Sequence, residues 1–300
     1  MALTKFLTES NTKETKKKEN VLLFDGHNLI YRTLHVANYH VPDDSKYLYW
    51  KYLMINSLFT SIRYFKPTKV VFAIDSKNHW RKNIYSQYKN RRKGARDKST
   101  IDFDKFYPIC DSFFEDLKKC LTNIHFIKVD SCEGDDIIAV LSKHVLNKED
   151  ITIISTDKDM IQLLTNHHIK LWDPISKKFR KSIRPERDKS IKVIMGDKSD
   201  DIPAIKKGVG IKTATKIYND GIDSFLEENE EYKKNYERNC QLIDFDLIPV
   251  SIRKKIENEY KNYKTKPYNG NRVWMFLLKN NIKKFSEDLQ MYSPFLKEIS

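Results

Sequence analysis

Residues 21–25 read Val-Leu-Leu-Phe-Asp, four consecutive apolar residues followed directly by an acid. A short, uninterrupted apolar run is typical of a strand that is buried on both faces of a parallel sheet. Similar runs recur at Val70–Ile74, Phe126–Val129, Ile151–Ile154 and Ile169–Trp172. The sequence therefore predicts a mostly parallel central sheet in the first two thirds of the chain.

Stretches with helical spacing lie between these runs. In Tyr47–Phe65 the apolar residues recur every three or four positions, and Phe103–Leu121 and Asp135–Leu146 show similar periodicity. Such spacing places apolar side chains on one side of a helix, which can then pack against a sheet. Because strands and helices alternate, the sequence predicts an α/β fold with crossover connections and helices flanking the sheet.

The pattern changes near residue 185, beyond which strand-like runs disappear. Helical spacing then dominates, at residues 190–196, 212–218, 224–243, 250–262 and 272–283. We therefore expect three parts along the chain. They are a flexible basic tail at residues 1–19, an α/β domain at residues 20–189 and a helical C-terminal domain at residues 190–300.

Charge and cysteine content narrow the class of protein. Lys and Arg outnumber Asp and Glu by 55 to 41, and the formal net charge of +14 favours anionic partners, nucleic acid first. The alternative is a basic protein that its charge keeps in solution. Four cysteines without a Cys-x-x-Cys pair indicate reduced thiols in a cytoplasmic compartment. No apolar run approaches the roughly 18 residues of a membrane span, so no membrane association is expected.

Acidic residues repeatedly follow the apolar runs. In an open parallel sheet, ligands bind beyond the carboxyl ends of the strands, so these acids are expected to converge. A single acid there is often only a turn or helix-capping residue, so the argument rests on their number. Glu133 and Asp136 are three residues apart and would share a helical face, and Asp197 and Asp200 repeat that spacing. The candidate metal ligands are Asp25, Asp75, Glu133, Asp135, Asp136, Asp157, Asp159, Asp197 and Asp200.

Converging carboxylates repel one another, by about 4 kcal/mol for each pair 4 Å apart at an effective dielectric constant of 20. Such a cluster would weaken the fold unless cations neutralised it. Ligation by oxygen alone, without His or Cys, suits Mg2+, for which Mn2+ can substitute. Two such ions ~3.5–4 Å apart fit phosphodiester hydrolysis, one activating water and the other stabilising the leaving 3′ oxygen.

The stretch from Lys77 to Lys98 contains nine Lys or Arg residues and one acid. It has few large aliphatic residues, so it is expected to be exposed or mobile. On a helix, Tyr88, Lys89 and Arg92 would lie on adjacent turns, outside the acidic groups, with Arg91 beside them. An aromatic ring next to cations suits stacking on an unpaired base and contact with phosphates. The alternative is a solvated helix or a disordered loop.

Residues 203–217 read Pro-Ala-Ile-Lys-Lys-Gly-Val-Gly-Ile-Lys-Thr-Ala-Thr-Lys-Ile, which predicts helix, glycine turn and helix. The glycines permit a tight hairpin whose backbone N–H groups can face a phosphate. A plain helical hairpin is the alternative. The candidate nucleic-acid contacts here are Lys206, Lys207, Gly208, Gly210, Lys212, Thr213 and Lys216, which carry charge but no base-specific code.

These motifs, taken in order, resemble a known family. They are FDGHN at Phe24–Asn28, AID at Ala73–Asp75, EGDD at Glu133–Asp136, STDKD at Ser155–Asp159, MGDKSDD at Met195–Asp201 and GVGIKTA at Gly208–Ala214. The chain resembles the 5′-nuclease family of flap endonucleases, phage 5′ exonucleases and the 5′-nuclease domains of bacterial DNA polymerases. YKNRRKGARDKST at Tyr88–Thr100 and LIDFDLIP at Leu242–Pro249 are most similar to its phage ribonuclease H branch.

The resemblance implies a role for each candidate. The first of two metals would be served mainly by Asp25, Asp75, Glu133, Asp135 and Asp136. The second would be served mainly by Asp159, Asp197 and Asp200, with Asp157 between the two. Under a helical arch at about residues 78–103, Lys89 and Arg92 would be catalytic beside the scissile phosphate, and Tyr88 would stack on a base. A helix–hairpin–helix at residues 203–221 would hold duplex, and in some relatives it also binds K+.

The sequence therefore predicts a monomeric, metal-dependent hydrolase with 5′–3′ exonuclease, ribonuclease H and flap endonuclease activity on DNA and RNA–DNA hybrids. Its expected role is RNA primer removal during replication. The resemblance also implies a single-strand-binding protein as partner and, for a phage-encoded chain, the host cytoplasm. One alternative is a PIN-like ribonuclease, against which the hairpin and the second acidic pair argue. Another is an inactive structure-specific DNA-binding scaffold, in which uncompensated carboxylates would have no purpose.

Overall fold

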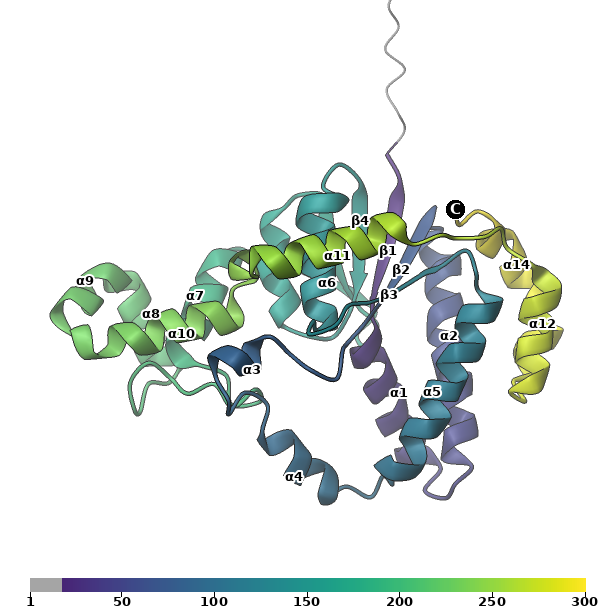
Figure 1. Ribbon diagram of the computed structural model, residues 1–300, viewed down its shortest axis with the longest axis horizontal. Helices are drawn as coiled ribbons and strands as arrows, with labels where there is room; N and C mark the ends of the chain where they lie inside the picture. Colours follow the sequence, from purple (N-terminus) through teal and green to yellow (C-terminus); the bar gives the residue numbers. More distant parts are fainter. Residues whose placement is uncertain (1–17) are drawn as a thin grey trace, which may run out of the picture.

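A six-stranded sheet forms the centre of the computed structural model, which describes residues 18–300 (Figure 1). The strand order is β3-β2-β1-β4-β5-β6, with β5 and β6 antiparallel and all other neighbours parallel. The strands are β1 (Asn20–Asp25), β2 (Lys69–Ile74), β3 (His125–Lys128), β4 (Asp150–Ile154), β5 (Ile169–Asp173) and β6 (Lys178–Arg180). All five expected strands are present, and the mostly parallel α/β fold is confirmed. The expected flexible tail lies largely outside the described residues.

Both faces of the sheet are covered, as the continuous apolar runs predict. In β1, Leu22 and Phe24 belong to one buried cluster, whereas Val21 and Leu23 belong to another on the opposite face. The first face is covered by α1 (Gly26–His40), α2 (Lys46–Phe65) and α5 (Phe103–Cys120). The second is covered by α6 (Gly134–Val140), the π-helical turn η1 (Leu141–Val145), the 3-10 turn η2 (Asp159–Thr165) and α11 (Val250–Asn262).

Helix α1 was not expected from the sequence, and its first residue explains one motif glycine. A Cβ atom on Gly26 would lie 2.3 Å from the carbonyl oxygen of Ala73. Any larger residue would therefore push the start of α1 away from β2. Glycine allows the chain to turn from the end of β1 straight into the helix.

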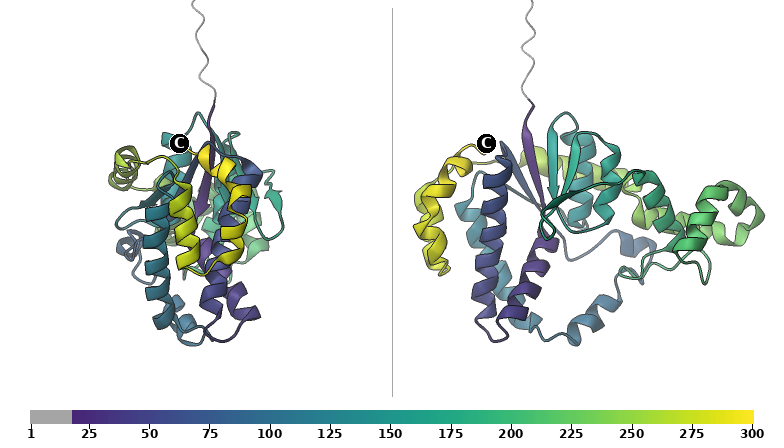
Figure 2. Two further views of the ribbon diagram at one scale, coloured as in Figure 1. Left: turned by 90° about the vertical axis from the view of Figure 1, so that its right-hand side faces the viewer. Right: turned by 180° about the vertical axis from the view of Figure 1, so that it is seen from behind.

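Between β2 and α5 the chain leaves the body in an arch that contains α3 (Arg81–Ile84) and α4 (Arg91–Asp97). Figures 1 and 2 show α4 well away from the sheet, bridging the side of α3 and the side of α5. The expectation that this stretch is exposed is only partly correct. Trp80, Arg81 and Tyr88 are buried, whereas Lys82, Arg91 and Arg92 are exposed.

The chain beyond residue 184 is mainly helical, as expected. It contains α7 (Pro185–Met195), α8 (Ile211–Asp220), α9 (Ile222–Glu228), η3 (Glu230–Tyr232), α10 (Lys233–Ile243), η4 (Phe245–Leu247), α11, α12 (Gly270–Lys279), α13 (Lys283–Glu287) and α14 (Leu289–Lys297). No helix among the described residues is long and apolar enough to cross a membrane.

These helices do not form one separate core. Ile194, Ile205 and Ala214 join α7, the following connection and α8 in a small cluster of their own. By contrast, Val273 of α12 and Leu296 of α14 belong to the large cluster that also contains residues of α2 and α5. Helices α12 and α14 lie beside α2 in Figures 1 and 2. Helices α7 and α8 thus share a small core, whereas α11 to α14 share the cores of the α/β part.

Candidate active site

Asp25 ends β1 and is also the capping residue of α1. Its Oδ1 accepts the amide hydrogen of Asn28 (3.0 Å), so the capping alternative is correct for this acid. Its Oδ2 accepts the hydroxyl hydrogen of Ser155 (2.7 Å), at the end of β4. Burial, with smaller repulsive contributions from Asp75 and Asp157, raises the pKa of Asp25 to about 6, although the hydrogen bonds from Ser155 and Asn28 lower it. Capping and membership of an acidic site therefore coexist in one side chain.

Three acids, Asp25, Asp135 and Asp157, form what we call the first cluster. The pKa of Asp135 is raised well above its ordinary value by burial and then by repulsion from Asp25 and Asp157. Among the described side chains, no Lys or Arg forms an ion pair with Asp25 or Asp135. Asp75 flanks the cluster. Burial would raise its pKa, but His27, 3.3 Å away, lowers it. Burial and mutual repulsion in the first cluster therefore disfavour ionisation of Asp25 and Asp135.

Asp159, Asp197 and Asp200 form the second cluster, in which ligand oxygens from all three lie within 4.8 Å of one another. Lys192 of α7 contacts Asp159 and lies 2.7 Å from Asp197 Oδ2. Burial would raise the pKa of Asp197, but Lys192 lowers it to about 2. Burial raises the pKa of Asp159, and repulsion from Asp157 adds to this against the effect of Lys192.

The two clusters are linked through the backbone. The amide of Asp159 donates to Asp157 Oδ1 (2.8 Å), so the two acids of the STDKD motif stand between the clusters. Asp197 and Asp200 do not share a helical face as expected. They lie in a turn that reciprocal hydrogen bonds between the backbones of Asp197 and Ile202 close (2.9 and 2.8 Å). The turn brings the carboxylates together without a helix.

Asp136 is a candidate ligand whose carboxylate oxygens already have donors within the protein. It is fully buried, and its Oδ1 accepts from Arg81 Nη2 (2.8 Å). Its Oδ2 accepts from Trp80 Nε1 (2.9 Å), from Arg81 Nη1 (3.1 Å) and from the amide of Glu133 (3.0 Å). Both oxygens are therefore satisfied by the protein. The EGDD motif does not place all of its acids on one face, because Glu133 caps α6 and Asp136 completes its capping box.

Glu133 lies beside the first cluster and meets several donors. Its Oε2 accepts from Arg81 Nη1 (2.8 Å) and from the Tyr88 hydroxyl (2.9 Å), while its Oε1 contacts Lys89. Burial alone would raise the pKa of Glu133, but Lys89 and Arg81 outweigh it and hold the pKa well below the ordinary value. Glu133 is thus ionised and already neutralised by the chain.

From the sequence, the arch residues were expected to lie outside the acidic groups. In the structure they contact these acids. Lys89 Nζ contacts Glu133 and lies 3.6 Å from Asp200 Oδ2, and Arg92 Nη2 lies 2.5 Å from Asp200 Oδ1. Tyr88 is 3 % exposed, so the structure does not present its ring for stacking. Arg91 is exposed but forms an ion pair with Asp201. The cations of the arch are held against the carboxylates.

The expected helix before the glycine turn is absent. Residues 203–210 are not helical, and the helix that precedes α8 is α7, which ends at Met195. Gly208 has a φ of 82°, the left-handed conformation that glycine adopts easily. The candidate nucleic-acid contacts of this element are solvent-exposed: Lys206, Lys207, Gly208, Gly210, Lys212, Thr213 and Lys216. The hairpin is therefore longer than expected, but its charged side chains face outward.

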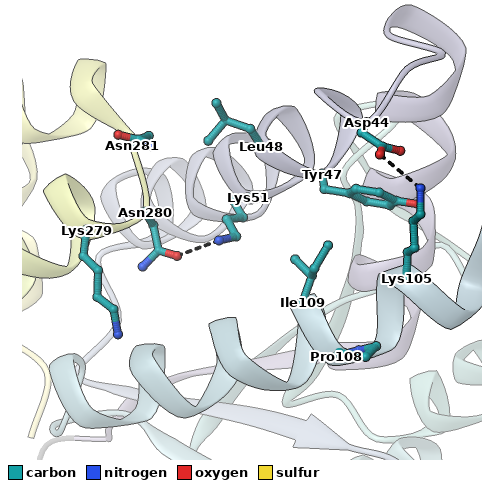
Figure 3. Close-up of a pocket in the computed structure, with 10 residues that line it drawn as sticks. All are labelled: Asp44, Tyr47, Leu48, Lys51, Lys105, Pro108, Ile109, Lys279, Asn280 and Asn281. Carbon is teal, nitrogen blue, oxygen red and sulfur yellow. Dashed lines mark hydrogen bonds and ion pairs between the residues drawn. The ribbon is translucent and has the colours of Figure 1, made fainter.

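A cavity of about 620 Å3 lies apart from these acids, between α2, α5 and the end of α12 (Figure 3). Its lysines already have partners within the protein. Lys105 lies 3.1 Å from Asp44, Lys51 donates to Asn280 (2.9 Å), and Lys279 lies 2.7 Å from Asp116. None of the candidate site residues lines it. The candidate active site is the acidic surface below the arch.

Comparison with known proteins decides the family. Residues 20–192 match the family model described as the 5′-3′ exonuclease, N-terminal resolvase-like domain. The chain belongs to the 5′-3′ exonuclease family. Its residues 203–292 match the model described as T4 RNase H, C terminal. Members of the 5′-3′ exonuclease family are hydrolytic nucleases, so the expectation of a nuclease related to the phage ribonuclease H branch is confirmed.

Two curated relatives of this 5′-3′ exonuclease family cover nearly the whole chain. Ribonuclease H of Enterobacteria phage T4 is 29% identical over 92% of this chain and 96% of its own length. The 5′-3′ exonuclease of Buchnera aphidicola is 26% identical over 95% of both. Among solved structures, the T5 D15 protein co-crystallised with metal ions matches with a TM-score of 0.62 at 19% identity, over 81% of this chain and 98% of its own. Because the sequence identity is only 19%, the match to the T5 D15 structure shows a similar fold alone.

Proposed function

We propose that this chain is a structure-specific 5′ nuclease that hydrolyses phosphodiesters near 5′ ends and at flaps by a two-metal mechanism. The single observation that carries the proposal is the pair of acidic clusters joined through Asp157 and Asp159. Two adjoining groups of carboxylates at the carboxyl edge of a parallel sheet suit two divalent cations that share one phosphate.

The donor set fits Mg2+ or Mn2+. All candidate ligands are carboxylate oxygens, and the raised pKa values of Asp25 and Asp135 show that burial and mutual repulsion disfavour their ionised forms, which a cation would stabilise. Asp25, Asp135, Asp75 and Glu133 would hold one cation and the second cluster the other, with Asp157 between them. When bound, the cations would activate water and stabilise charge on the leaving 3′ oxygen. Asp136 is not part of this proposal.

The chain's own cations would position the scissile phosphate. Lys89 and Arg92 neutralise Glu133 and Asp200 in this structure, so they stand at the place where a phosphate would meet the clusters. Lys89 carries a compact charge and Arg92 a planar fork that can contact two phosphate oxygens. Transfer of these side chains from carboxylate to phosphate would aid catalysis, because charge on the phosphate grows in the transition state.

Duplex would be held by the hairpin of α7 and α8. Ala214 and Ile217 anchor α8 in the small core, so the exposed Lys212 and Lys216 have a rigid base. Backbone N–H groups at the start of α8 and these lysines suit phosphate oxygens. The carbonyl groups near Gly208 and Gly210 are the proposed place of K+.

The proposed substrates are DNA and RNA–DNA hybrids with free 5′ ends or flaps, and the proposed role is primer removal. The similarity to a phage ribonuclease H and to a 5′-3′ exonuclease over nearly the full chain supports both. The proposal includes action as a monomer in the host cytoplasm beside a single-strand-binding protein, on the strength of the phage relative.

One digestion experiment tests the proposal. Matched 5′-labelled flap, nicked, hybrid and single-stranded substrates are incubated with the protein in Mg2+ and in EDTA. We expect cleavage near the 5′ end of the first three substrates in Mg2+ alone. Preferential cutting of single-stranded RNA would favour the PIN-like ribonuclease. Binding without cutting in Mg2+ and in Mn2+ would favour the inactive scaffold.

A binding experiment tests the hairpin. Reversing both charges, Lys212→Glu with Lys216→Glu, should weaken duplex binding for every sequence, because phosphate contacts carry no base code. The slope of log affinity against log salt should shrink by about 0.9 for each phosphate that the variant no longer neutralises. Lys254→Glu with Lys255→Glu, two exposed lysines of α11, is the charge-matched control. If both double variants changed duplex affinity and its salt dependence equally, the hairpin would not be part of the duplex-binding site.

A further inference from the structure

Arg81, at the start of the arch, is the most deeply buried arginine of the site region, with 2 % of its surface exposed. Its guanidinium has three sets of partners. Nε donates to the carbonyl oxygen of Leu242 in α10 (2.8 Å), Nη1 to Glu133 Oε2 (2.8 Å) and Nη2 to Asp136 Oδ1 (2.8 Å). One side chain therefore connects the arch, the start of α6 and the end of α10.

The surroundings of Arg81 leave it little freedom. Its guanidinium lies 4.5 Å from the centre of the Trp80 ring, and the indole N–H of Trp80 donates to the same Asp136 carboxylate (2.9 Å). Burial would lower the pKa of Arg81, but Asp136 and Glu133 raise it well above the ordinary value. Arg81 is thus a fixed positive charge inside the protein.

Stability alone is a poor reason for this network. Buried ion pairs lose so much hydration that apolar residues of similar volume are often equally stable or better. What the network does supply is orientation. Glu133 has a long, flexible side chain, and its Oε2 is held by Arg81 and by the Tyr88 hydroxyl (2.9 Å). The other oxygen, Oε1, is thereby held against Lys89, which also lies 3.6 Å from Asp200 of the second cluster.

We infer that Arg81 and Asp136 are positioning residues that fix the Glu133 carboxylate as a ligand for a divalent cation. The inference rests on the proposed function, because it assumes that Glu133 contacts the metal. Asp136 holds Arg81 by two parallel hydrogen bonds, and Arg81 holds Oε2 of Glu133. Oε1, which contacts Lys89 in this structure, would meet the cation once Lys89 moves to the phosphate. Partners of this kind, behind the ligands, commonly change metal affinity by about ten- to a hundredfold when removed.

Arginine is required at this position because of its geometry. Asp136, Glu133 and the Leu242 carbonyl lie in three directions around a planar group with five donors. A lysine carries the same charge on a single nitrogen and cannot reach all three acceptors. The same argument explains why an acid stands at Asp136, since its two oxygens fix the plane of the guanidinium.

The test compares Mn2+ affinity, measured by direct titration without nucleic acid, with thermal unfolding in EDTA. The main variant is Arg81→Met with Asp136→Asn, which removes both buried charges together. We expect Mn2+ affinity to fall at least tenfold while the variant still unfolds cooperatively. The matched control is Arg180→Met with Asp173→Asn, a partly exposed arginine 2.8 Å from a buried aspartate at the β5–β6 edge. This control should leave Mn2+ affinity unchanged whatever it does to stability.

Glu133→Gln shows whether the effect acts through Glu133. It should weaken Mn2+ binding, and adding the Arg81 and Asp136 substitutions to it should cause little further loss, because interacting residues are not additive. Additive losses, or parent-like affinity in the Arg81 and Asp136 variant, would overturn the inference. Parent-like affinity of Glu133→Gln itself would instead overturn the metal site proposed for Glu133. If the double substitution does not fold, Arg81→Lys replaces it, with an expected loss of at least fivefold in Mn2+ affinity.

Discussion

The first and second clusters contain the same chemical groups but are neutralised in different ways. Asp25 and Asp135 have no basic partner, and burial with mutual repulsion raises their pKa values. Asp197 and Asp200 lie against Lys192, Lys89 and Arg92, and Lys192 lowers the pKa of Asp197 to about 2. Without a metal, protons balance the first cluster, whereas lysine and arginine side chains balance the second.

This difference shows what a divalent cation must displace. In the first cluster it competes with protons, so its affinity depends on pH. In the second it competes with side chains that can move away, and two of these belong to the arch. Filling the second site would therefore release Arg92 toward a phosphate, and Lys89 would follow once Glu133 binds the other cation. The contrast also corrects the assumption that only metals could relieve the repulsion, because the chain supplies part of the countercharge itself.

Asp157→Asn should have the largest effect, because Asp157 raises the pKa of acids in both clusters and accepts from the amide of Asp159. Cleavage should be abolished, while the fold and duplex binding in Ca2+ persist, since Ca2+ binds with a looser geometry than catalysis requires. Single-turnover cleavage in Mg2+ measures this. A rate near that of the parent would show that the clusters work independently and that the two-metal assignment is wrong.

Lys89→Ala or Arg92→Ala should slow single-turnover cleavage by on the order of a hundredfold, as expected for loss of one oriented transition-state donor. Duplex binding should change little, because the hairpin supplies that contact. Mn2+ affinity should stay equal or rise, since a competing cation has been removed from Glu133 or Asp200. Lys98→Ala, an exposed arch lysine, is the control. Reduced duplex affinity with an unchanged rate of the chemical step would show that the arch cations only attract the nucleic acid and do not position the phosphate.

Much of the fold could be predicted from the sequence because buried parallel strands leave a simple signal. Each expected strand is present within one or two residues, and the acids after them do gather at the carboxyl edge. The resemblance also implied the second cluster as a set, although the helical face expected for Asp197 and Asp200 was wrong. Asp197 and Asp200 meet in a turn rather than on a helix, and a spacing of three fits both.

What sequence reasoning missed depends on long-range pairing. Nothing in the EGDD motif distinguishes Asp135, which faces Asp25, from Asp136, which faces Arg81. The distinction comes from the arch folding back onto α6, and this also buries Tyr88. A signal was present in hindsight, since Trp80-Arg81 is an aromatic–cation pair in an otherwise polar stretch. Lys192 was overlooked because it lies inside α7, and one of its partners, Asp159, is 33 residues earlier in the chain.

The pH dependence of metal binding should separate the clusters. The pKa of Asp25 in the metal-free fold is about 6, above its ordinary value of 3.8, so protons stabilise this fold below about pH 6. This stabilisation by protons is lost as the pH rises through 6. Over the same range metal binding becomes easier, because fewer protons must be displaced. Mn2+ affinity of an Asp159→Asn, Asp197→Asn variant, which keeps the first cluster, should fall about tenfold per pH unit below pH 6 for each proton displaced.

The complementary variant, Asp25→Asn with Asp135→Asn, keeps the second cluster. There Asp197 is already ionised, and only Asp159 has a raised pKa. Its Mn2+ affinity should therefore change less steeply between pH 5 and pH 8. Equal slopes in the two variants would contradict the division into a proton-balanced and a side-chain-balanced cluster.

Lys192→Met should have the smallest effect of these variants, and it tests the second cluster alone. Lys192 contacts Asp159 and lies 2.7 Å from Asp197, so its loss leaves two carboxylates without their partner. In EDTA the variant should be less stable by about 1–3 kcal/mol, the usual cost of an unpaired buried polar group. A bound divalent cation replaces the missing charge, so added Mn2+ should stabilise the variant more than the parent, in proportion to its tighter binding.

Lys189→Met is the matched control, because Lys189 lies on the same helix but pairs with Asp244, 2.8 Å away, outside both clusters. Thermal unfolding of both variants, in EDTA and across an Mn2+ series, compares the two lysines directly. If Mn2+ stabilised Lys192→Met no more than Lys189→Met, Lys192 would be a structural ion pair and the second cluster would not be balanced by a displaceable side chain.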